Sequence, residues 1–194
     1  MVKLGESEKI VSVLPVKEFK DDQFVLSVTA GGYVKKTELM AYSNIRASGI
    51  IGLKLDDDDQ LVACAITNGK QEVLIATRMG KAIRFTEEDI RPMGRSARGV
   101  TGVKFSEEED KVIGLCVVKG EDSILSVCEN GYGKRTPLDE YRVQPRAGKG
   151  IYTIKVTERN GPVVGIMQVA EDDHLMVLTS SGKVKRFTVS EVGK

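Results

Sequence analysis

The chain has 194 residues, of which 41% are hydrophobic and 5% aromatic, with no Trp and a net charge of +1. This length suits one sizeable domain, and the hydrophobic content excludes wholesale disorder. No apolar signal core lies near the N-terminus, and no run approaches ~20 apolar residues, so the sequence predicts a cytoplasmic protein without a membrane partner. Cys64, Cys116 and Cys128 lack metal or disulfide spacing and are expected to be reduced core thiols.

Two sets of glycines reveal an internal repeat. The turn glycines Gly32, Gly80, Gly131 and Gly182 are spaced by 48, 51 and 51 residues. A second set, at positions 49, 99 and 150, is spaced by 50 and 51 residues. A shared period of about 50 residues indicates repeated supersecondary units. We predict one domain, 1–194, made of repeats at approximately 8–59, 60–110, 111–160 and 161–194.

Each repeat contains the same predicted strands in the same order. The first is an apolar run rich in Val and Ile, at 10–16, 61–67, 112–118 and 163–169. The second run, at 24–30, 72–78, 123–129 and 174–180, leads into the turn glycine, and a third run follows. Such short runs joined by Gly-containing turns indicate antiparallel hairpins. A fourth run follows the second glycine in the first three repeats only. The predicted fold is therefore all-β and propeller-like, with four-stranded antiparallel blades, the last one truncated.

Positive charge gathers in the third run and the loop after it. In the four repeats these segments carry a net +11, which leaves −10 for the rest of the chain. The acids gather in turns such as 56–59, 107–110 and 171–173. Equivalent positions of a radial array lie at equivalent radii, so we expect a continuous basic belt with the acidic turns elsewhere. Such a belt is an electrostatic footprint for phosphate backbones and predicts double-stranded DNA as the partner.

Sixteen cations of this belt are the predicted DNA-binding residues. Four of them, Lys36, Arg84, Arg135 and Arg186, are in register between repeats. Phe85 follows one of them and should point to the opposite face of its strand, which predicts an exposed cation opposite a buried ring. The full set is Lys35, Lys36, Arg46, Lys81, Arg84, Arg91, Arg95, Arg98, Lys134, Arg135, Arg142, Arg146, Lys149, Lys183, Lys185 and Arg186.

The motifs "NGYGKRT" at 130–136 and "KVTERNG" at 155–161, with "GYVKKT" and "GKAIRF", resemble the C-terminal domain of DNA gyrase A over essentially the whole chain. The matching domain of topoisomerase IV is a weaker resemblance. The resemblance implies a β-pinwheel, a propeller-like disc whose blades exchange strands and whose basic rim bends and wraps DNA. It also implies the rest of gyrase A, together with gyrase B, as partners in a nucleoid-associated, ATP-hydrolysing type IIA topoisomerase that introduces negative supercoils.

The chain departs from this family in two respects. The family's domain has six blades, and this chain resembles the last four. The signature heptad Gln-Arg-Arg-Gly-Gly-Lys-Gly belongs to the first of the six, and only a degenerate copy, "QPRAGKG", occurs here at 144–150. The resemblance therefore does not assign the wrapping role of the true heptad to residues 144–150.

The sequence predicts no catalytic residue, metal site or cofactor, so the isolated chain is not expected to be an enzyme. Its one histidine, His174, has no metal-ligand spacing around it and is expected at the surface or a strand edge. "RAGKG" lacks the GxxxxGK[ST] spacing of a phosphate loop. A propeller that only binds other proteins is the alternative function, and the basic belt favours DNA over it.

Overall fold

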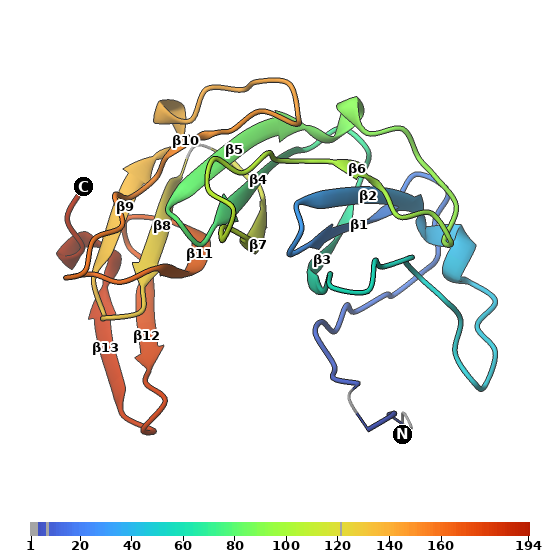
Figure 1. The fold of residues 1–194 in the computed structure, drawn as a ribbon, viewed down its shortest axis with the longest axis horizontal. Helices are drawn as coiled ribbons and strands as arrows, with labels where there is room; N and C mark the ends of the chain where they lie inside the picture. Colours follow the sequence, from blue (N-terminus) through green and yellow to red (C-terminus); the bar gives the residue numbers. More distant parts are fainter. Residues whose placement is uncertain (1–3, 7, 121) are drawn as a thin grey trace.

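The computed structural model describes residues 4–6, 8–120 and 122–194, and these form an arch of β-sheets (Figure 1). Four antiparallel hairpins follow one another along it. Each hairpin is followed by a single 3-10 turn, labelled η. The elements in chain order are β1 (Phe24–Thr29), β2 (Tyr33–Glu38), η1 (Leu39–Tyr42), β3 (Leu61–Thr67), β4 (Glu72–Thr77), β5 (Lys81–Thr86), η2 (Glu87–Asp89), β6 (Val100–Thr101), β7 (Val112–Val117), β8 (Ser123–Cys128), β9 (Gly133–Pro137), η3 (Leu138–Glu140), β10 (Ile151–Tyr152), β11 (Val163–Val169), β12 (His174–Leu178), β13 (Val184–Thr188) and η4 (Val189–Glu191).

The sheets are built by exchange of strands between successive repeats. Hairpin 1 (β1–β2) lies between β3 and β6, which both belong to the second repeat of the sequence. Hairpin 2 (β4–β5) lies between β7 and β10 of the third repeat, and hairpin 3 (β8–β9) receives β11 from the fourth. Hairpin 4 (β12–β13) forms a two-stranded sheet. The predicted antiparallel blades are confirmed, but the structure assembles each four-stranded sheet from two consecutive repeats.

The segment 10–16 is the one predicted first strand that does not form a strand. It carries an apolar run like those of β3, β7 and β11, but its backbone has no strand pairing among the described residues. Ile10 and Val13 are 60% and 82% exposed. β3, β7 and β11 are each held by pairing with the hairpin of the preceding repeat, a contact that segment 10–16 lacks among the described residues.

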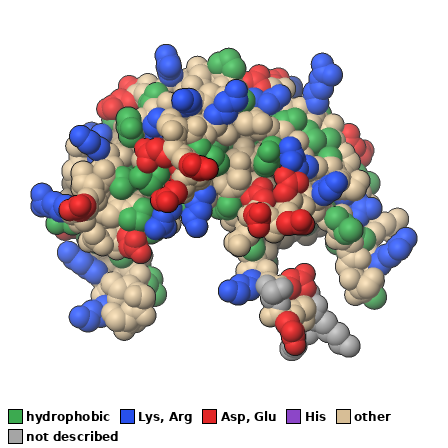
Figure 2. Space-filling view, in the orientation of Figure 1, with side chains coloured by type: hydrophobic (Ala, Val, Ile, Leu, Met, Phe, Trp, Pro, Cys, Tyr) green, Lys and Arg blue, Asp and Glu red, His purple; other side chains and the backbone are tan. Residues whose placement is uncertain are grey.

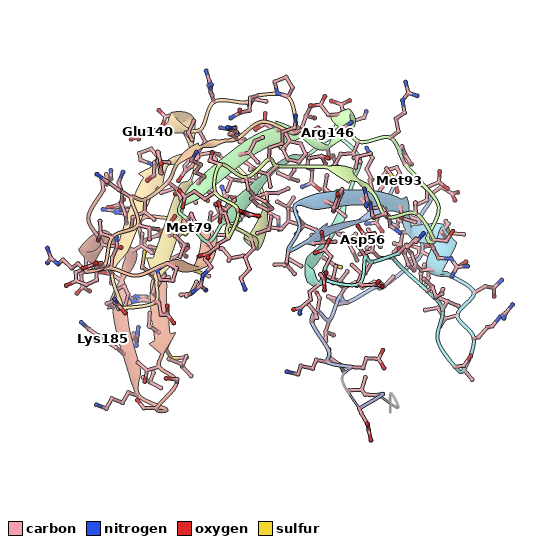
Figure 3. The ribbon with its side chains drawn as sticks, in the orientation of Figure 1. Asp56, Met79, Met93, Glu140, Arg146 and Lys185 are labelled. Carbon is pink, nitrogen blue, oxygen red and sulfur yellow. The ribbon has the colours of Figure 1, made fainter. Side chains whose placement is uncertain are left out.

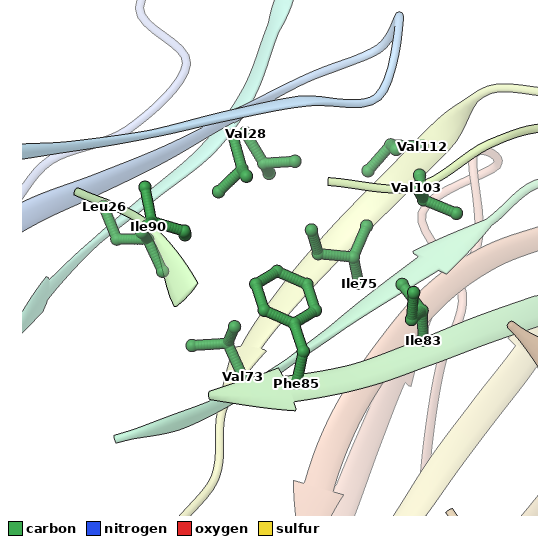
Figure 4. Packing of buried hydrophobic residues seen from close by; sticks show 10 residues of the cluster. Leu26, Val28, Val73, Ile75, Ile83, Phe85, Ile90, Val103 and Val112 are labelled. Atoms are coloured by element: carbon green, nitrogen blue, oxygen red, sulfur yellow. The ribbon is translucent and has the colours of Figure 1, made fainter. Parts of the chain in front are cut away.

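The core consists of three layers, each sandwiched between two neighbouring hairpins. Alternate residues of a strand point to opposite faces, and both faces of hairpin 2 are buried. Val73, Ile75 and Phe85 pack against Leu26 and Val28 of hairpin 1, as Figure 4 shows. The opposite face of hairpin 2 packs on hairpin 3 through Leu74, Ala76, Ala82, Ile124 and Leu138. A third layer joins hairpins 3 and 4 through Leu125, Leu175 and Val189.

The turn glycines are required by backbone geometry. Gly80 has a φ of +82°, a left-handed conformation that disfavours any residue with a Cβ atom. A Cβ at Gly80 would also lie 2.1 Å from the carbonyl oxygen of Ile154, just beyond the exchanged strand β10. Gly182 has a nearly identical φ of +78°, but a Cβ there meets no atom within 4 Å. The two glycines have the same backbone conformation, but only Gly80 packs against a segment of the neighbouring repeat.

We predict that Gly80→Ala lowers the free energy of unfolding by clearly more than Gly182→Ala. Each substitution introduces the strain of a positive φ, which exceeds about 1 kcal/mol, and only Gly80→Ala also displaces the exchanged segment. Urea denaturation of both variants measures the difference. Equal losses for the two variants would contradict a contribution from the packing of Ile154 against this turn.

Candidate nucleic-acid interface

The cations aligned on the third strands, named here the junction cations, join one repeat to the next. Lys36, Arg84 and Arg135 are three of them, and Arg186 is the fourth. The Lys36 Nζ donates to the Glu87 carbonyl of η2 at 2.7 Å. The Arg84 guanidinium donates to the Leu138 carbonyl of η3 at 2.8 Å and to Tyr141 O at 3.1 Å.

Hairpin 3 repeats the arrangement at the following junction. The Arg135 Nε donates to the Val192 carbonyl, immediately after η4, at 2.7 Å, and its guanidinium pairs with Glu171. A 3-10 turn leaves carbonyl groups without intrahelical partners at its end. The Tyr141 and Val192 carbonyls, just past η3 and η4, are such groups, and they accept from Arg84 and Arg135. The Glu87 and Leu138 carbonyls already accept the closing N–H of their own turns, so the junction cation adds a second hydrogen bond to each.

The prediction that the junction cations form an exposed face is wrong for three of the four. Lys36 and Arg135 are 4% and 6% exposed, and the side chain of Arg84 is 16% exposed. The predicted alternation holds, because Phe85 does point away from Arg84 and is buried. The prediction assumed that one face of each hairpin is exposed to solvent. In the structure, neighbouring repeats cover both faces of a hairpin such as hairpin 2.

Lys35 is a second buried cation among the predicted DNA contacts. It is 1% exposed, and its Nζ donates to the carbonyls of Gly52 and Arg95, each at 2.6 Å. Burial and, secondarily, the nearby Arg95 guanidinium lower the pKa of Lys35 to about 8. Lys35 therefore links the loops that contain Gly52 and Arg95, and it is too buried to contact a ligand.

The exposed members of the predicted set lie in the loops that cross between repeats and on hairpin 4. The crossing loops are the segments 91–99 and 141–150, which lead to β6 and β10, and the segment 43–49 is their counterpart in the first repeat. In Figure 2, Lys and Arg side chains are spread along the convex edge of the arch and at its two ends, with acidic side chains among them. The exposed residues are Arg46, Arg91, Arg98, Arg142, Lys149, Lys183, Lys185 and Arg186. Four others, Lys81, Arg95, Lys134 and Arg146, are partly exposed, as is Arg84.

Some of the loop cations are committed to contacts within the protein. Arg98 pairs with Asp56 at 2.6 Å and stacks on the Tyr33 ring at 4.1 Å from its centroid. Arg146, labelled in Figure 3 at the outer edge of the arch, donates to the Thr101 carbonyl at 2.9 Å. Asp56 belongs to the acidic turn 56–59, so the expected separation of acidic turns from the basic belt is incomplete. Arg91, Arg142 and Lys149 are exposed and make no ion pair within the described chain.

The degenerate heptad at 144–150 is a backbone clasp between repeats. The Gln144 N–H donates to the Arg84 carbonyl at 3.0 Å, and the Ala147 N–H donates to the Gly102 carbonyl at 2.7 Å. Ala147 has a φ of +64°, a conformation suited to the glycine that the full motif places there. Lys149 remains exposed beside this clasp.

Sequence reasoning missed an exposed cation that does recur in register. Lys54, Lys104 and Lys155 each follow the second turn glycine of their repeat by five residues, and all three are exposed. The signal was present in the runs "GIIGLK", "GVTGVK" and "GIYTIK". These lysines lie in the fourth runs, beyond the third runs and loops that define the predicted belt.

The three cysteines and the one histidine all lie in strands. Burial raises the pKa of the Cys116 thiol to about 11, and the three cysteines are free. His174 is exposed at the start of β12, as expected. The described residues include no helix of the length and apolarity that crossing a membrane requires.

A strand-exchanged, propeller-like array of four-strand units defines the β-pinwheel class. A sequence model described as the DNA gyrase C-terminal domain, beta-propeller, matches residues 23–68, 71–119, 122–170 and 173–194. The chain belongs to this family. It is 45% identical to the DNA gyrase A subunit of Salmonella typhimurium over 192 residues, and 39% identical to that of Haloquadratum walsbyi over 198 residues. Each match covers 99% of this chain but only 22% or 23% of the relative.

Solved structures agree with this assignment. A structure of the DNA gyrase A C-terminal domain matches with a TM-score of 0.89 and 29% identity, over all of this chain and 64% of that one. The C-terminal domain of DNA topoisomerase IV matches with a TM-score of 0.90 and 27% identity, over 98% of this chain and 59% of that one. The backbone matches both families equally well. The sequence identity to gyrase A subunits is what assigns the chain to the gyrase family.

We predict that Arg84→Gln destabilises the chain by about 2–3 kcal/mol, because it removes the charged hydrogen bonds to the Leu138 and Tyr141 carbonyls and the ion pair with Glu72. Arg186→Gln is the matched control. It occupies the same register on the exposed hairpin 4 and should change stability by less than about 0.5 kcal/mol. Urea denaturation gives both values. A loss at position 186 as large as that at position 84 would contradict the junction role.

A second prediction concerns pH. The folded-state pKa of Lys35 lies below its ordinary value of 10.5, so in the window from about pH 8 to 10.5 the unfolded chain binds the extra proton. Lys35 therefore makes stability rise with pH through this window. The difference in unfolding free energy, wild type minus Lys35→Met, should increase from pH 7.5 to pH 10. A difference that stays flat or falls would mean that Lys35 titrates normally.

Proposed function

We propose that this chain binds and bends double-stranded DNA as part of gyrase A, and so supports negative supercoiling by the whole enzyme. The observation that carries the proposal is the recurrence of exposed, uncommitted cations in the crossing loops, here Arg91, Arg142 and Lys149. Lys and Arg side chains on loops suit phosphate contacts that position DNA without reading its sequence. Family membership supports the same role.

The site residues in this proposal differ from the sequence-based set. Lys35, Lys36, Arg84 and Arg135 hold the arch together, and the phosphate contacts fall to the exposed loop and hairpin cations. Lys81 and Lys134 on the strands and Arg95 in a crossing loop are partly exposed, and Lys54, Lys104 and Lys155 extend the basic surface. The remaining partners in the proposal are the other domains of gyrase A and the whole of gyrase B, in the nucleoid of the cytoplasm. The ATP-hydrolysing step belongs to those other parts.

Bending requires contacts that only curved DNA can make. Bending a 20–30 base-pair site by 40–90° costs on the order of 1–6 kcal/mol. Cations spaced along the convex edge of the arch (Figure 2) can offset this cost, since each repeat adds further phosphate contacts. The incomplete heptad at 144–150 acts within the protein as a clasp. We therefore expect curvature of the duplex without a stable wrap of defined hand.

We predict steeply salt-dependent binding with little sequence preference. If about six phosphates are contacted, log K should fall against log salt with a slope near −5. The triple variant Arg91→Gln, Arg142→Gln, Lys149→Gln should make the slope shallower by about 2–3, since each contact contributes ~0.9. The control Lys9→Gln, Lys17→Gln, Lys70→Gln removes the same charge from exposed sites outside the crossing loops and should change the slope by less than about 1. Fluorescence anisotropy across a salt series measures both.

A wild-type slope shallower than about −2 would contradict the DNA interface and favour a propeller that binds proteins. Energy transfer between the ends of a duplex of about 40 base pairs tests the bend separately. Ends that draw together on saturation support bending, and an unchanged end-to-end distance would show that the cations bind straight DNA.

A further inference from the structure

A buried hydrogen bond closes the crossing loop 141–150 at its base. Tyr141 begins this loop directly after η3, and Thr153 directly follows β10, the short strand to which the loop leads. The hydroxyl groups of these two residues share a hydrogen bond, and the Ser126 Oγ shares a second one with the Thr153 Oγ1 at 2.7 Å. Tyr141 and Thr153 are each 1% exposed, and Ser126 is fully buried. The two ends of the loop are therefore tied together inside the protein.

Apolar side chains occupy two of the same places in the second repeat. Ile75 is the counterpart of Ser126 and Ile90 that of Tyr141, and both isoleucines belong to the core layer between hairpins 1 and 2. The fold can thus fill these positions without polar groups. Burying a hydroxyl costs free energy unless it is hydrogen-bonded, and a hydrogen bond in a dry layer specifies one geometry. The hydroxyl groups of the third repeat therefore point to a requirement for a defined loop position.

A comparable closure recurs in the first repeat. The Tyr42 hydroxyl donates to the Gly52 carbonyl at 3.1 Å. Tyr42 occupies the place of Tyr141, and Gly52 occupies that of Thr153, because each of the latter two lies three residues after the second turn glycine. In both repeats a tyrosine at the start of the segment thus binds a residue just beyond its end.

The crossing loop of the second repeat is held by a different group. The Lys35 Nζ of hairpin 1 donates to the carbonyls of Gly94 and Arg95 in this loop, at 3.4 and 2.6 Å. Hairpin 2 has Ile83 in the place of Lys35, three residues after its turn glycine, so this position offers loop 141–150 no donor. The hydroxyl pair at the base of loop 141–150 takes over the same function.

The closed loop carries two of the exposed cations assigned to DNA. Arg142 directly follows Tyr141, and Lys149 lies near the other end, four residues before Thr153. Figure 1 shows the loop between η3 and β10 at the convex edge of the arch. A loop that is ordered before binding loses less conformational freedom on association than one that must be ordered by its ligand. Closing the base of the loop therefore favours binding through its two cations.

We propose that Tyr141 and Thr153 are positioning residues for the phosphate contacts of Arg142 and Lys149. Their hydrogen bond sets the distance between the two ends of the loop, and with it the spacing of the two cations along the DNA backbone. The role rests on the proposed function, since both buried residues act on DNA only through the loop that they close.

The test uses substitutions that remove no charge. Tyr141→Phe and Thr153→Val each delete one hydroxyl group, and fluorescence anisotropy with a labelled duplex measures log K against log salt. Both variants should make the slope shallower by about 1–2, since each lost phosphate contact contributes ~0.9. Thr153→Ser keeps a hydroxyl and should retain the wild-type slope. Tyr132→Phe is the matched control, because its hydroxyl accepts from the Arg159 Nε at 3.0 Å outside the crossing loops, and it should change the slope by less than about 0.5.

Removal of the loop charges provides a second measurement. Arg142→Gln together with Lys149→Gln should make the slope shallower by about 2, and adding Tyr141→Phe to this pair should change it no further. Hydrogen exchange should become faster at residues 142–149 in Tyr141→Phe and stay unchanged at residues 91–99. Faster exchange in both segments would show a general loss of stability and overturn the positioning role.

The outcomes separate this role from the DNA interface on which it rests. A wild-type slope of about −5 that Tyr141→Phe leaves unchanged overturns the positioning role and leaves the DNA interface intact. A wild-type slope shallower than about −2 overturns the DNA interface itself, and the positioning role with it. Loss of the folded state in both Tyr141→Phe and Thr153→Val also overturns the positioning role, because the hydroxyl pair would then hold the whole domain and not one loop.

Discussion

The arch depends on a charged donor that reaches from each of hairpins 1, 2 and 3 to the 3-10 turn of the next repeat. Lys36, Arg84 and Arg135 perform this role at three successive junctions, each on buried or half-buried carbonyl groups. Without the donor, the Tyr141 and Val192 carbonyls would lose the one printed partner each has, and the Glu87 carbonyl would lose a charged hydrogen bond, at a cost of about one lost hydrogen bond each. The donor therefore fixes the position of the next repeat, and the apolar layers between hairpins pack around that fixed point.

Strand exchange also joins each hairpin to the next repeat. A hairpin of two short strands is marginal by itself, and here the next repeat adds a strand to each edge of hairpins 1 and 2. The exchanged segment also supplies the surface against which turn glycines such as Gly80 pack. Burial of both sheet faces explains why cations in the middle of a strand became structural, and why the surface left for a ligand lies in the loops between repeats.

Much of the fold could be predicted from sequence because glycines recur at the same position of each repeat. Gly32, Gly80, Gly131 and Gly182 all adopt positive φ values, and the hairpin strands begin and end close to the predicted runs. The first and fourth predicted runs of the first repeat, at 10–16 and after Gly49, form no strand, and the fourth runs of the next two repeats form only the short strands β6 and β10. The candidate site was predicted less well. A run such as "KRT" at 134–136 shows that cations recur but not which neighbour covers them, because burial of Arg135 depends on Val192, far along the chain. The partner of a strand is likewise set by the next repeat, which local periodicity does not reveal.

Exchange of strands has a consequence for how such a chain changes length over evolution. Deleting residues 61–110 would remove β3 and β6 from hairpin 1 together with hairpin 2 itself, yet β7 and β10 would then follow hairpin 1 in the same order. The chain can therefore gain or lose whole periods and keep every junction chemically equivalent. Loss of half a period would leave a hairpin beside a strand of the wrong register. Natural variation in the number of blades is thus confined by this architecture to integral steps, and the curvature of the surface changes by one blade at a time.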